Sequence, residues 1–165
     1  MWRKMKRIII MSILASILGL FGCSKTKAED KWTVATGDDN GKPMIVRFRA
    51  DTPTGVDTKK YPHLLAISWK YKPENEGGMP SETDNKRMVL LEELLDSLED
   101  KRTAYMTVAV TCNGVKEWQW YSRDTEETIN LLNSALSGQA QFPIEISLDE
   151  DPSWSAYLKF KNGAK

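Results

Sequence analysis

The sequence predicts an α+β domain in which two helices cover one face of an antiparallel sheet. The spacing of apolar residues changes along the chain between a period of two and a period of about 3.6 residues. Two Asn-Gly pairs, Asn40-Gly41 and Asn113-Gly114, are typical of two-residue β-hairpin turns. The segment from Glu82 to Glu99 carries the leucine stripe of an amphipathic helix. Together these patterns indicate hairpins combined with helices.

The first part of the predicted domain is a hairpin followed by a third strand. Short strands over Lys31–Thr36 and Met44–Arg49 are joined through the first Asn-Gly pair. A loop rich in Thr, Pro, Gly and Lys fills residues 50–60, and residues 63–71 then form a strand. Alternate side chains of a strand share a face, so one face of this strand carries His63, Leu65, Ile67, Trp69 and Tyr71.

A capped helix follows, and then a second hairpin. Ser81 and Asp84 approximate a capping box for the helix over Glu82–Glu99. The acidic residues of this helix lie off its leucine stripe and are expected to face water: Glu92, Glu93 and Asp96. Strands over Tyr105–Cys112 and Val115–Ser122 are closed by the second Asn-Gly pair.

The chain ends in a helix, a strand and a short helix. Asp124 and Glu127 cap a second helix that ends at Gly138, and Pro143–Leu148 is the last strand, with Ile144, Ile146 and Leu148 inward. Asp151-Pro152 opens a short C-terminal helix, because proline is favoured at the first helical position. From His63 onward the order is strand, helix, strand, strand, helix, strand. This is the split βαβ plan of ferredoxin-like domains, here extended by the N-terminal hairpin.

The first 22 residues predict a location outside the cytoplasm. A basic start precedes an apolar stretch that is too short for a permanent membrane span. The junction Leu20-Phe21-Gly22-Cys23 resembles the bacterial lipobox, in which the cysteine is lipidated and becomes the first residue. We therefore expect a lipoprotein signal peptide over 1–22, a lipidated Cys23 with a flexible tether over 23–30, and one domain over 31–165.

The same segment sets the expected location. The lipid on Cys23 would anchor the chain to a bacterial membrane. Ser24 stands where aspartate would signal retention in the inner membrane of enteric bacteria, and it therefore favours the outer membrane where two membranes exist.

Charge and composition exclude several classes. Beyond residue 22 there are 19 basic and 23 acidic residues, a net charge of −4, which argues against a nucleic-acid partner. Two cysteines and one histidine exclude a disulfide framework and a zinc cluster. The acidic runs are more typical of a solvated face, a turn or a helix cap than of a metal site. No metal or cofactor is therefore expected.

His63 is the only histidine and the one candidate for imidazole chemistry. On an apolar strand face it is more often a structural, hydrogen-bonded residue. No Gly-x-Ser-x-Gly elbow is present, and Cys112 has no second mature thiol and no signal of activation. A small envelope hydrolase or metal-dependent enzyme that uses His63 with an acidic residue such as Asp151 stays open as an alternative.

Aromatic residues are the least ordinary feature. Trp118 and Trp120 share one face of a central strand, whereas Tyr121 points to the other. Either the C-terminal helix docks on an aromatic face through Trp154 and Tyr157, or the rings stay exposed as a binding platform. The candidate binding residues are Trp69, Trp118, Trp120, Trp154, Tyr157 and His63. A platform of this kind would suit a protein, a small molecule or a glycan.

Several short motifs occur together in one order. They are Trp32, Gly41-Lys42-Pro43, Tyr61-Pro62-His63, Gly78-Met79-Pro80, Leu91-Glu92-Glu93, Asn113-Gly114 and Asp151-Pro152-Ser153-Trp154-Ser155-Ala156-Tyr157. Over Lys31 to Phe160 the chain resembles the bacterial family catalogued as domain of unknown function 695. That family is similar to RraB-type regulators of ribonuclease E, which share a ferredoxin-like plan and bind a nuclease. The resemblance implies a fold and protein binding, and no reaction.

The combined prediction is a lipid-anchored, extracytoplasmic binding module whose partner is another envelope protein. The cytoplasmic nuclease is not carried over as the partner, because Cys23 sends this chain out of the cytoplasm. An uncovered edge strand would allow pairing between copies, and the sequence leaves the oligomeric state open.

Overall fold

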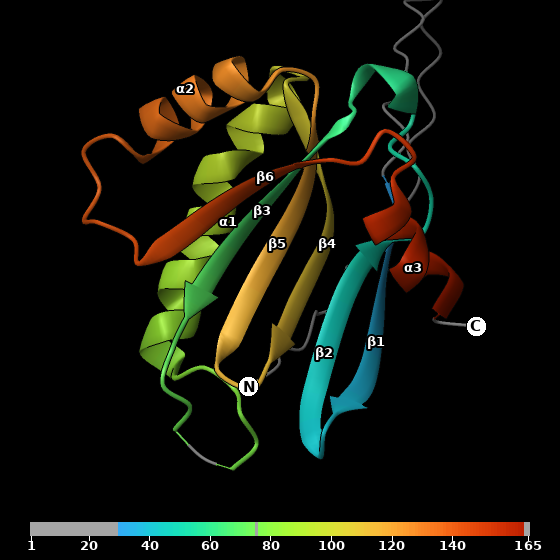
Figure 1. The fold of residues 1–165 in the computed structure, drawn as a ribbon. Coiled ribbons are helices and arrows are strands. Elements are labelled where there is room, and N and C mark those ends of the chain that lie inside the picture. Colours follow the sequence, from blue (N-terminus) through green and yellow to red (C-terminus); the bar gives the residue numbers. More distant parts are fainter. Residues whose placement is uncertain (1–29, 75, 164–165) are drawn as a thin grey trace, which may run out of the picture.

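The computed structural model describes residues 30–74 and 76–163, which form an antiparallel sheet of six strands with helices on both faces (Figure 1). The strand order is β1-β2-β4-β5-β3-β6. The α+β class and the extension of the sheet by the N-terminal hairpin are therefore confirmed. The predicted signal peptide and Cys23 lie outside the described residues.

Each predicted strand and helix is present, with small shifts at the ends. The strands are β1 (Trp32–Asp39), β2 (Lys42–Arg49), β3 (His63–Lys70), β4 (Ala104–Cys112), β5 (Val115–Ser122) and β6 (Ile144–Glu150). The helices are α1 (Glu82–Asp100), α2 (Thr125–Leu136) and α3 (Ser155–Gly163). A short 3-10 helix, η1 (Thr58–Lys60), lies in the loop after β2 and was not predicted.

Both Asn-Gly pairs form the tight turns expected of them. Asn40 and Gly41 have φ angles of 53° and 79°, and Asn113 and Gly114 have 43° and 81°. Positive φ at both central residues belongs to the hairpin turn whose twist matches its strands. The first turn is tighter than predicted, because Asp39 still pairs with Lys42.

The helix starts follow the predicted caps. The Ser81 hydroxyl accepts the backbone N–H of Asp84 at 3.0 Å, and the Asp124 carboxylate accepts that of Glu127 at 2.8 Å. Each bond satisfies a backbone donor that the first helical turn leaves open.

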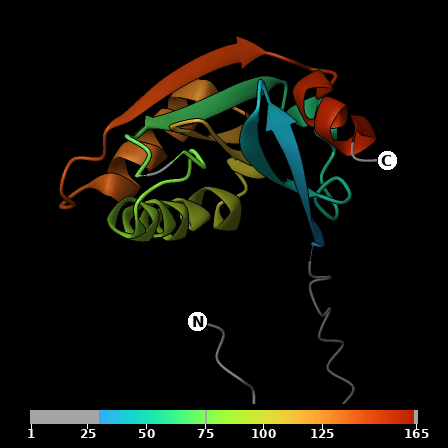
Figure 2. The same ribbon diagram turned by 90° about the horizontal axis from the view of Figure 1, so that it is seen from below.

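Two apolar clusters lie on opposite faces of the sheet. Under α1 and α2 the core contains Leu65, Ile67, Trp69, Trp118 and Trp120, together with the leucine stripe of α1. On the other face Tyr157 of α3 and Trp154, the residue before this helix, pack over Val46, Phe48 and Tyr121. Figure 2 shows α1 and α2 beneath one side of the sheet and α3 on its opposite face. None of the described helices is long and apolar enough to cross a membrane.

One detail of the last strand differs from the prediction. Ile146 and Leu148 share the helix-bearing face with Ile67 and Leu65, as predicted, but they are 39% and 43% exposed and not buried. Among the described strands, β6 lies at the edge of the sheet and pairs with β3 alone, so no neighbouring strand covers its other side.

Candidate functional site

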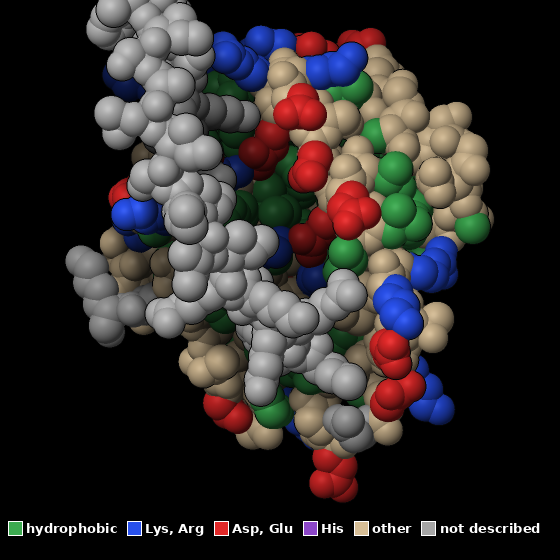
Figure 3. All heavy atoms as spheres, turned by 180° about the vertical axis from the view of Figure 1, so that it is seen from behind, with side chains coloured by type: hydrophobic (Ala, Val, Ile, Leu, Met, Phe, Trp, Pro, Cys, Tyr) green, Lys and Arg blue, Asp and Glu red, His purple; other side chains and the backbone are tan. Residues whose placement is uncertain are grey.

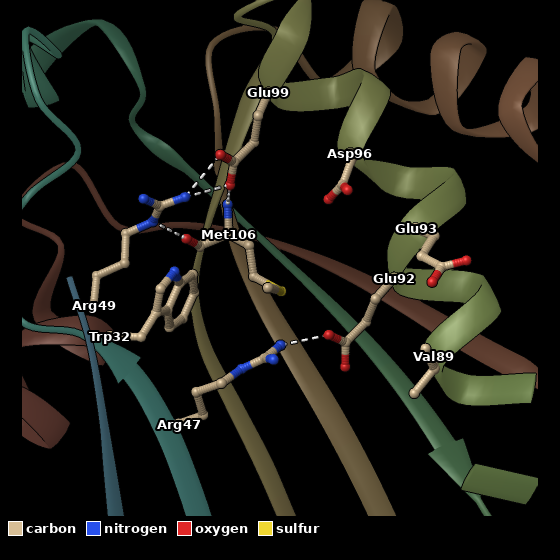
Figure 4. Close-up of a pocket in the computed structure, with 9 residues that line it drawn as sticks. All are labelled: Trp32, Arg47, Arg49, Val89, Glu92, Glu93, Asp96, Glu99 and Met106. Atoms are coloured by element: carbon tan, nitrogen blue, oxygen red, sulfur yellow. Dashed lines mark hydrogen bonds and ion pairs between the residues drawn. The ribbon is translucent and has the colours of Figure 1, made fainter. Parts of the chain in front are cut away.

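A groove opens between α1 and the N-terminal hairpin on the helix-bearing face of the sheet. Its cavity has a volume of about 270 Å³. Figure 3 shows this hollow from behind, with a hydrophobic floor and carboxylates along one wall. The cavity is lined by Trp32, Arg47 and Arg49 from the hairpin, by Met106 from β4, and by Val89, Glu92, Glu93, Asp96 and Glu99 from α1 (Figure 4).

Glu92 is the centre of one ionic network in the groove. Its carboxylate contacts Arg47 at 2.5 Å and Lys116 at 2.9 Å, and accepts the Trp118 indole N–H at 2.7 Å. Burial alone raises the pKa of this carboxyl, but Lys116, the indole bond and Arg47 outweigh it and the pKa is lowered. The prediction that Glu92 faces water is therefore wrong, because its side chain is only 18% exposed and is paired.

Arg49 is the centre of a second network, at the end of the groove where Glu99 lies (Figure 4). The residue is 3% exposed. Its guanidinium donates to both oxygens of Glu99 at 2.6 and 2.7 Å, to the carbonyl of Met106 at 2.6 Å, and to Asp30. Glu99 also accepts the backbone N–H of Met106 at 2.9 Å. The two side chains thus satisfy both backbone groups of Met106, where β4 has a bulge next to Val108.

Trp32 completes this end of the groove. The guanidinium carbons of Arg47 and Arg49 lie 5.1 and 4.8 Å from its ring centroid. Both distances are within cation–π range. Asp30, the last residue of the predicted tether, also bonds the backbone and hydroxyl of Thr54. The start of the domain is therefore held by Arg49 and Thr54.

Two further acids on the wall, Glu93 and Asp96, have no such partner in the described part of the chain. Among those residues, none donates a hydrogen bond to either carboxylate or forms an ion pair with it (Figure 4). Burial raises the pKa of Asp96, and so do the nearby carboxylates of Glu99, Asp100, Glu92 and Glu93. The cavity lining has two arginines against four carboxylates, and the adjoining Asp30 and Lys116 offset each other, so the charge left over in the groove is negative.

An exposed apolar strip continues the groove along the hairpin. Val34 pairs with Arg47 across the β1–β2 ladder, and Ile45 pairs with Thr36. Alternation along each strand places Val34 and Ile45 on the same sheet face as Trp32 and Arg47. Val34 is 64% exposed and Ile45 is 41% exposed. We use "the groove" for the residues lining the cavity together with Val34 and Ile45.

The five aromatic residues singled out from the sequence are core residues. Trp69, Trp118, Trp120 and Tyr157 are each 1% exposed, and Trp154 is 2% exposed. The expectation of an exposed platform is therefore corrected for these positions, since α1 and α2 cover three of the rings and the other two come from α3 and the residue just before it. Trp154 stacks on Tyr121 with ring centroids 4.1 Å apart. The alternative interpretation, in which the C-terminal helix docks on an aromatic face, describes what α3 does.

His63 and Asp151 do not come together. His63 faces the α2 side of the sheet, where its Nδ1 lies 2.8 Å from Glu150. Asp151 follows Glu150 and points to the α3 side, where it accepts four hydrogen bonds. These donors use the lone pairs that a general base would need. The structure thus gives the His63–Asp151 pairing no geometric support.

The remaining candidates show no sign of activation. Burial, Asp39 and Asp38 raise the pKa of the Cys112 thiol, which is the opposite of what a nucleophile requires. Within residues 30–74 and 76–163, no group of three or more His, Cys, Asp or Glu side chains is placed to hold a metal ion.

The family profile described as "Family of unknown function (DUF695)" matches residues 30–161, which is most of the chain. The chain belongs to this family. The match begins at Asp30 and includes Trp32, both arginines and α1, so the whole groove lies within the DUF695 domain. No curated protein matches the chain.

Proposed function

We propose that this DUF695 protein is a lipid-anchored, non-catalytic binding module of the cell envelope that holds a protein partner in the groove. The observation that carries the proposal is the groove itself. It combines exposed apolar side chains of the hairpin, Val34 and Ile45, with the carboxylates of Glu93 and Asp96 on α1, which no described cation neutralises. Exposed apolar patches rimmed by polar residues are typical of protein interaction sites.

We further propose that the arrangement of the domain is ferredoxin-like. The strand order β6-β3-β5-β4, with α1 between β3 and β4 and α2 between β5 and β6, supports this. Similarity to RraB-type regulators, which bind a protein and catalyse no reaction, would be in line with the proposal.

The binding proposal is tested by photo-cross-linking in the native cells. A benzophenone amino acid replaces Val89, which lines the groove and is 44% exposed, in the full chain. We expect light-dependent capture of an envelope protein from position 89. The same probe at Glu126, an exposed residue of α2, should capture little of that protein. Equal capture from both positions, or none from position 89, would contradict the groove as the binding site.

Anchoring by lipid gives a separate prediction about Cys23. Replacing Cys23 with serine removes the acceptor of the acyl chains, so we expect the chain to move from the membrane fraction to the soluble fraction after cell lysis. The control is Cys112→Ser, which should leave the protein in the membrane fraction. Intact-mass analysis of the wild-type protein should show acyl chains on Cys23. A Cys23→Ser protein that still sediments with membranes would rule the anchor out.

A further inference from the structure

We propose that the partner fills the groove with an amphipathic helix whose apolar side faces the β1–β2 hairpin and whose lysine or arginine residues face α1. This names the kind of partner for the proposed function and rests on it. The inference comes from the size of the uncovered surface, its apolar floor and its charge.

The uncovered surface has the dimensions of one helix. α1 and α2 lie beneath the other strands on this face, but none of the described helices lies beneath β1 and β2 (Figure 2). Strands are about 4.8 Å apart, so two strands present a strip about 10 Å wide. An α-helix with its side chains is about 10–12 Å across. A helix beside α1 would therefore complete the helical layer, whereas an extended segment would leave much of the strip open.

The floor of the groove requires an apolar side on that helix. Val34, Ile45 and the half-buried ring of Trp32 lie on this face of the strip, beside Arg47 and Thr36, and Val89 lines the cavity from α1 together with Trp32. Along β1, Trp32 and Thr36 are about 14 Å apart at about 3.4 Å per residue. This length matches two to three helical turns, over which an apolar stripe recurs at every third or fourth residue.

The acidic wall of the groove requires positive charge on the partner helix. Glu93 and Asp96 are three residues apart on α1 and are both exposed. Residues at this spacing are neighbours on a helix surface, so two basic residues three or four positions apart on an adjacent helix can face them. The like-charged carboxylates around Asp96 make this stretch of α1 repulsive by itself, and a cation would relieve that repulsion. An acidic or neutral helix would leave it in place.

The experiment uses the full chain in native cells with the photoreactive residue at position 89. The captured protein is digested, and the peptide joined to position 89 is identified by mass spectrometry. We expect a helical segment with Lys or Arg at positions i and i+3 or i+4 and an apolar stripe beside them. The double variant Glu93→Lys with Asp96→Lys should lower the cross-linking yield at least tenfold. Both residues are exposed and outside the core, so the variant should fold, which its CD spectrum and urea midpoint would verify.

A matched control carries the same change in net charge away from the groove. Glu126→Lys with Asp149→Lys alters two exposed acids on α2 and β6 and should leave the yield within about twofold. Reversing the two basic residues of the partner to glutamate should restore capture by the double variant of Glu93 and Asp96 to near the wild-type level.

Other outcomes would overturn the inference while leaving the proposed function intact. One is capture of a segment that is extended, acidic or without an apolar stripe. Another is a yield that does not change in the double variant. A third is capture of a second copy of this chain, for example through α3, which carries Lys159 and the 40% exposed Leu158. Absence of any capture from position 89 would instead contradict the proposed function.

Discussion

Replacing Arg49 with methionine is expected to lower the free energy of unfolding by about 3–5 kcal/mol, the range for removing one partner of a buried ion pair. Methionine keeps much of the volume but none of the donors. The carboxylate of Glu99 would lose its bidentate partner, and the carbonyl of Met106 would lose the 2.6 Å bond that satisfies it at the bulge. Trp32 and Asp30 would also lose contacts that hold the start of β1.

Urea unfolding of the purified protein measures this effect. A suitable control is Lys70→Met, which breaks an exposed pair with Glu145 and should cost at most about 1 kcal/mol. The double variant Arg49→Met with Glu99→Gln should recover part of the loss, because it removes the unpaired charge while the amide oxygen can still accept the Met106 N–H. A change of less than about 1 kcal/mol in Arg49→Met would show that the network contributes little to stability.

Local signals in the sequence were sufficient to predict the helices and strands. The Asn-Gly pairs require positive φ at both residues, and the capping residues Ser81 and Asp124 bond the backbone three residues later. Each of these features depends on residues that are close in the sequence. The exposed side chains of β6 could not be predicted in this way, because their cover depends on what lies beyond the edge of the sheet.

The groove could not be predicted from local patterns for the same reason. Its residues come from four separate elements, and they meet only because β2 pairs with β4 and α1 crosses the same face. One signal was present. Arg47 and Arg49 alternate with the apolar Val46 and Phe48, so one face of a strand inside the sheet carries two buried or half-buried cations. Buried cations need carboxylate partners, and Glu92 and Glu99 of the acidic flank of α1, together with Asp30, supply them.

The aromatic residues show the opposite error, in which a conspicuous feature is structural. A sheet that is covered by its main helices on one face needs cover on its second face, and here Trp154, together with Tyr157 of the short helix α3 that follows it, supplies this cover. The rings of Trp118 and Trp120 point to the other face, under α1 and α2. Most of the aromatic residues therefore build two cores, and the groove contributes one ring, that of Trp32, among charged and aliphatic side chains.

The junction between β6 and α3 depends on Asp151. Each of its carboxylate oxygens accepts two bonds. One accepts the backbone N–H of Ser155 at 2.9 Å and the Ser153 hydroxyl at 3.1 Å, and the other accepts the N–H of Ala156 at 2.9 Å and the Tyr121 hydroxyl at 2.6 Å. Burial alone raises the pKa of this carboxyl, but the donors of Ala156, Tyr121 and Ser155 hold it well below its usual range.

Changing Asp151 to asparagine is therefore expected to lower the free energy of unfolding by about 3 kcal/mol, because hydrogen bonds to a charged group contribute about 1.5–3 kcal/mol each. The amide group that replaces one oxygen is a donor, so two of the four donors lose their acceptor. Asp149→Asn, at an exposed position two residues earlier, should change the stability by less than about 0.5 kcal/mol. A similar loss in both variants would show that the bonds of Asp151 are not the cause.

The difference in unfolding free energy between the wild type and Asp151→Asn should depend on pH, and this dependence identifies the Asp151 carboxylate as the source of the difference. The pKa of Asp151 is lower in the folded state than the value of about 3.9 expected in the unfolded chain. Its contribution is thus complete above about pH 5 and is lost as the pH falls through the folded-state pKa. The stability gap between wild type and Asp151→Asn should be constant from about pH 5 to 8 and should narrow below about pH 4. A gap that stays the same down to about pH 3 would mean that the asparagine acts through shape and not through charge.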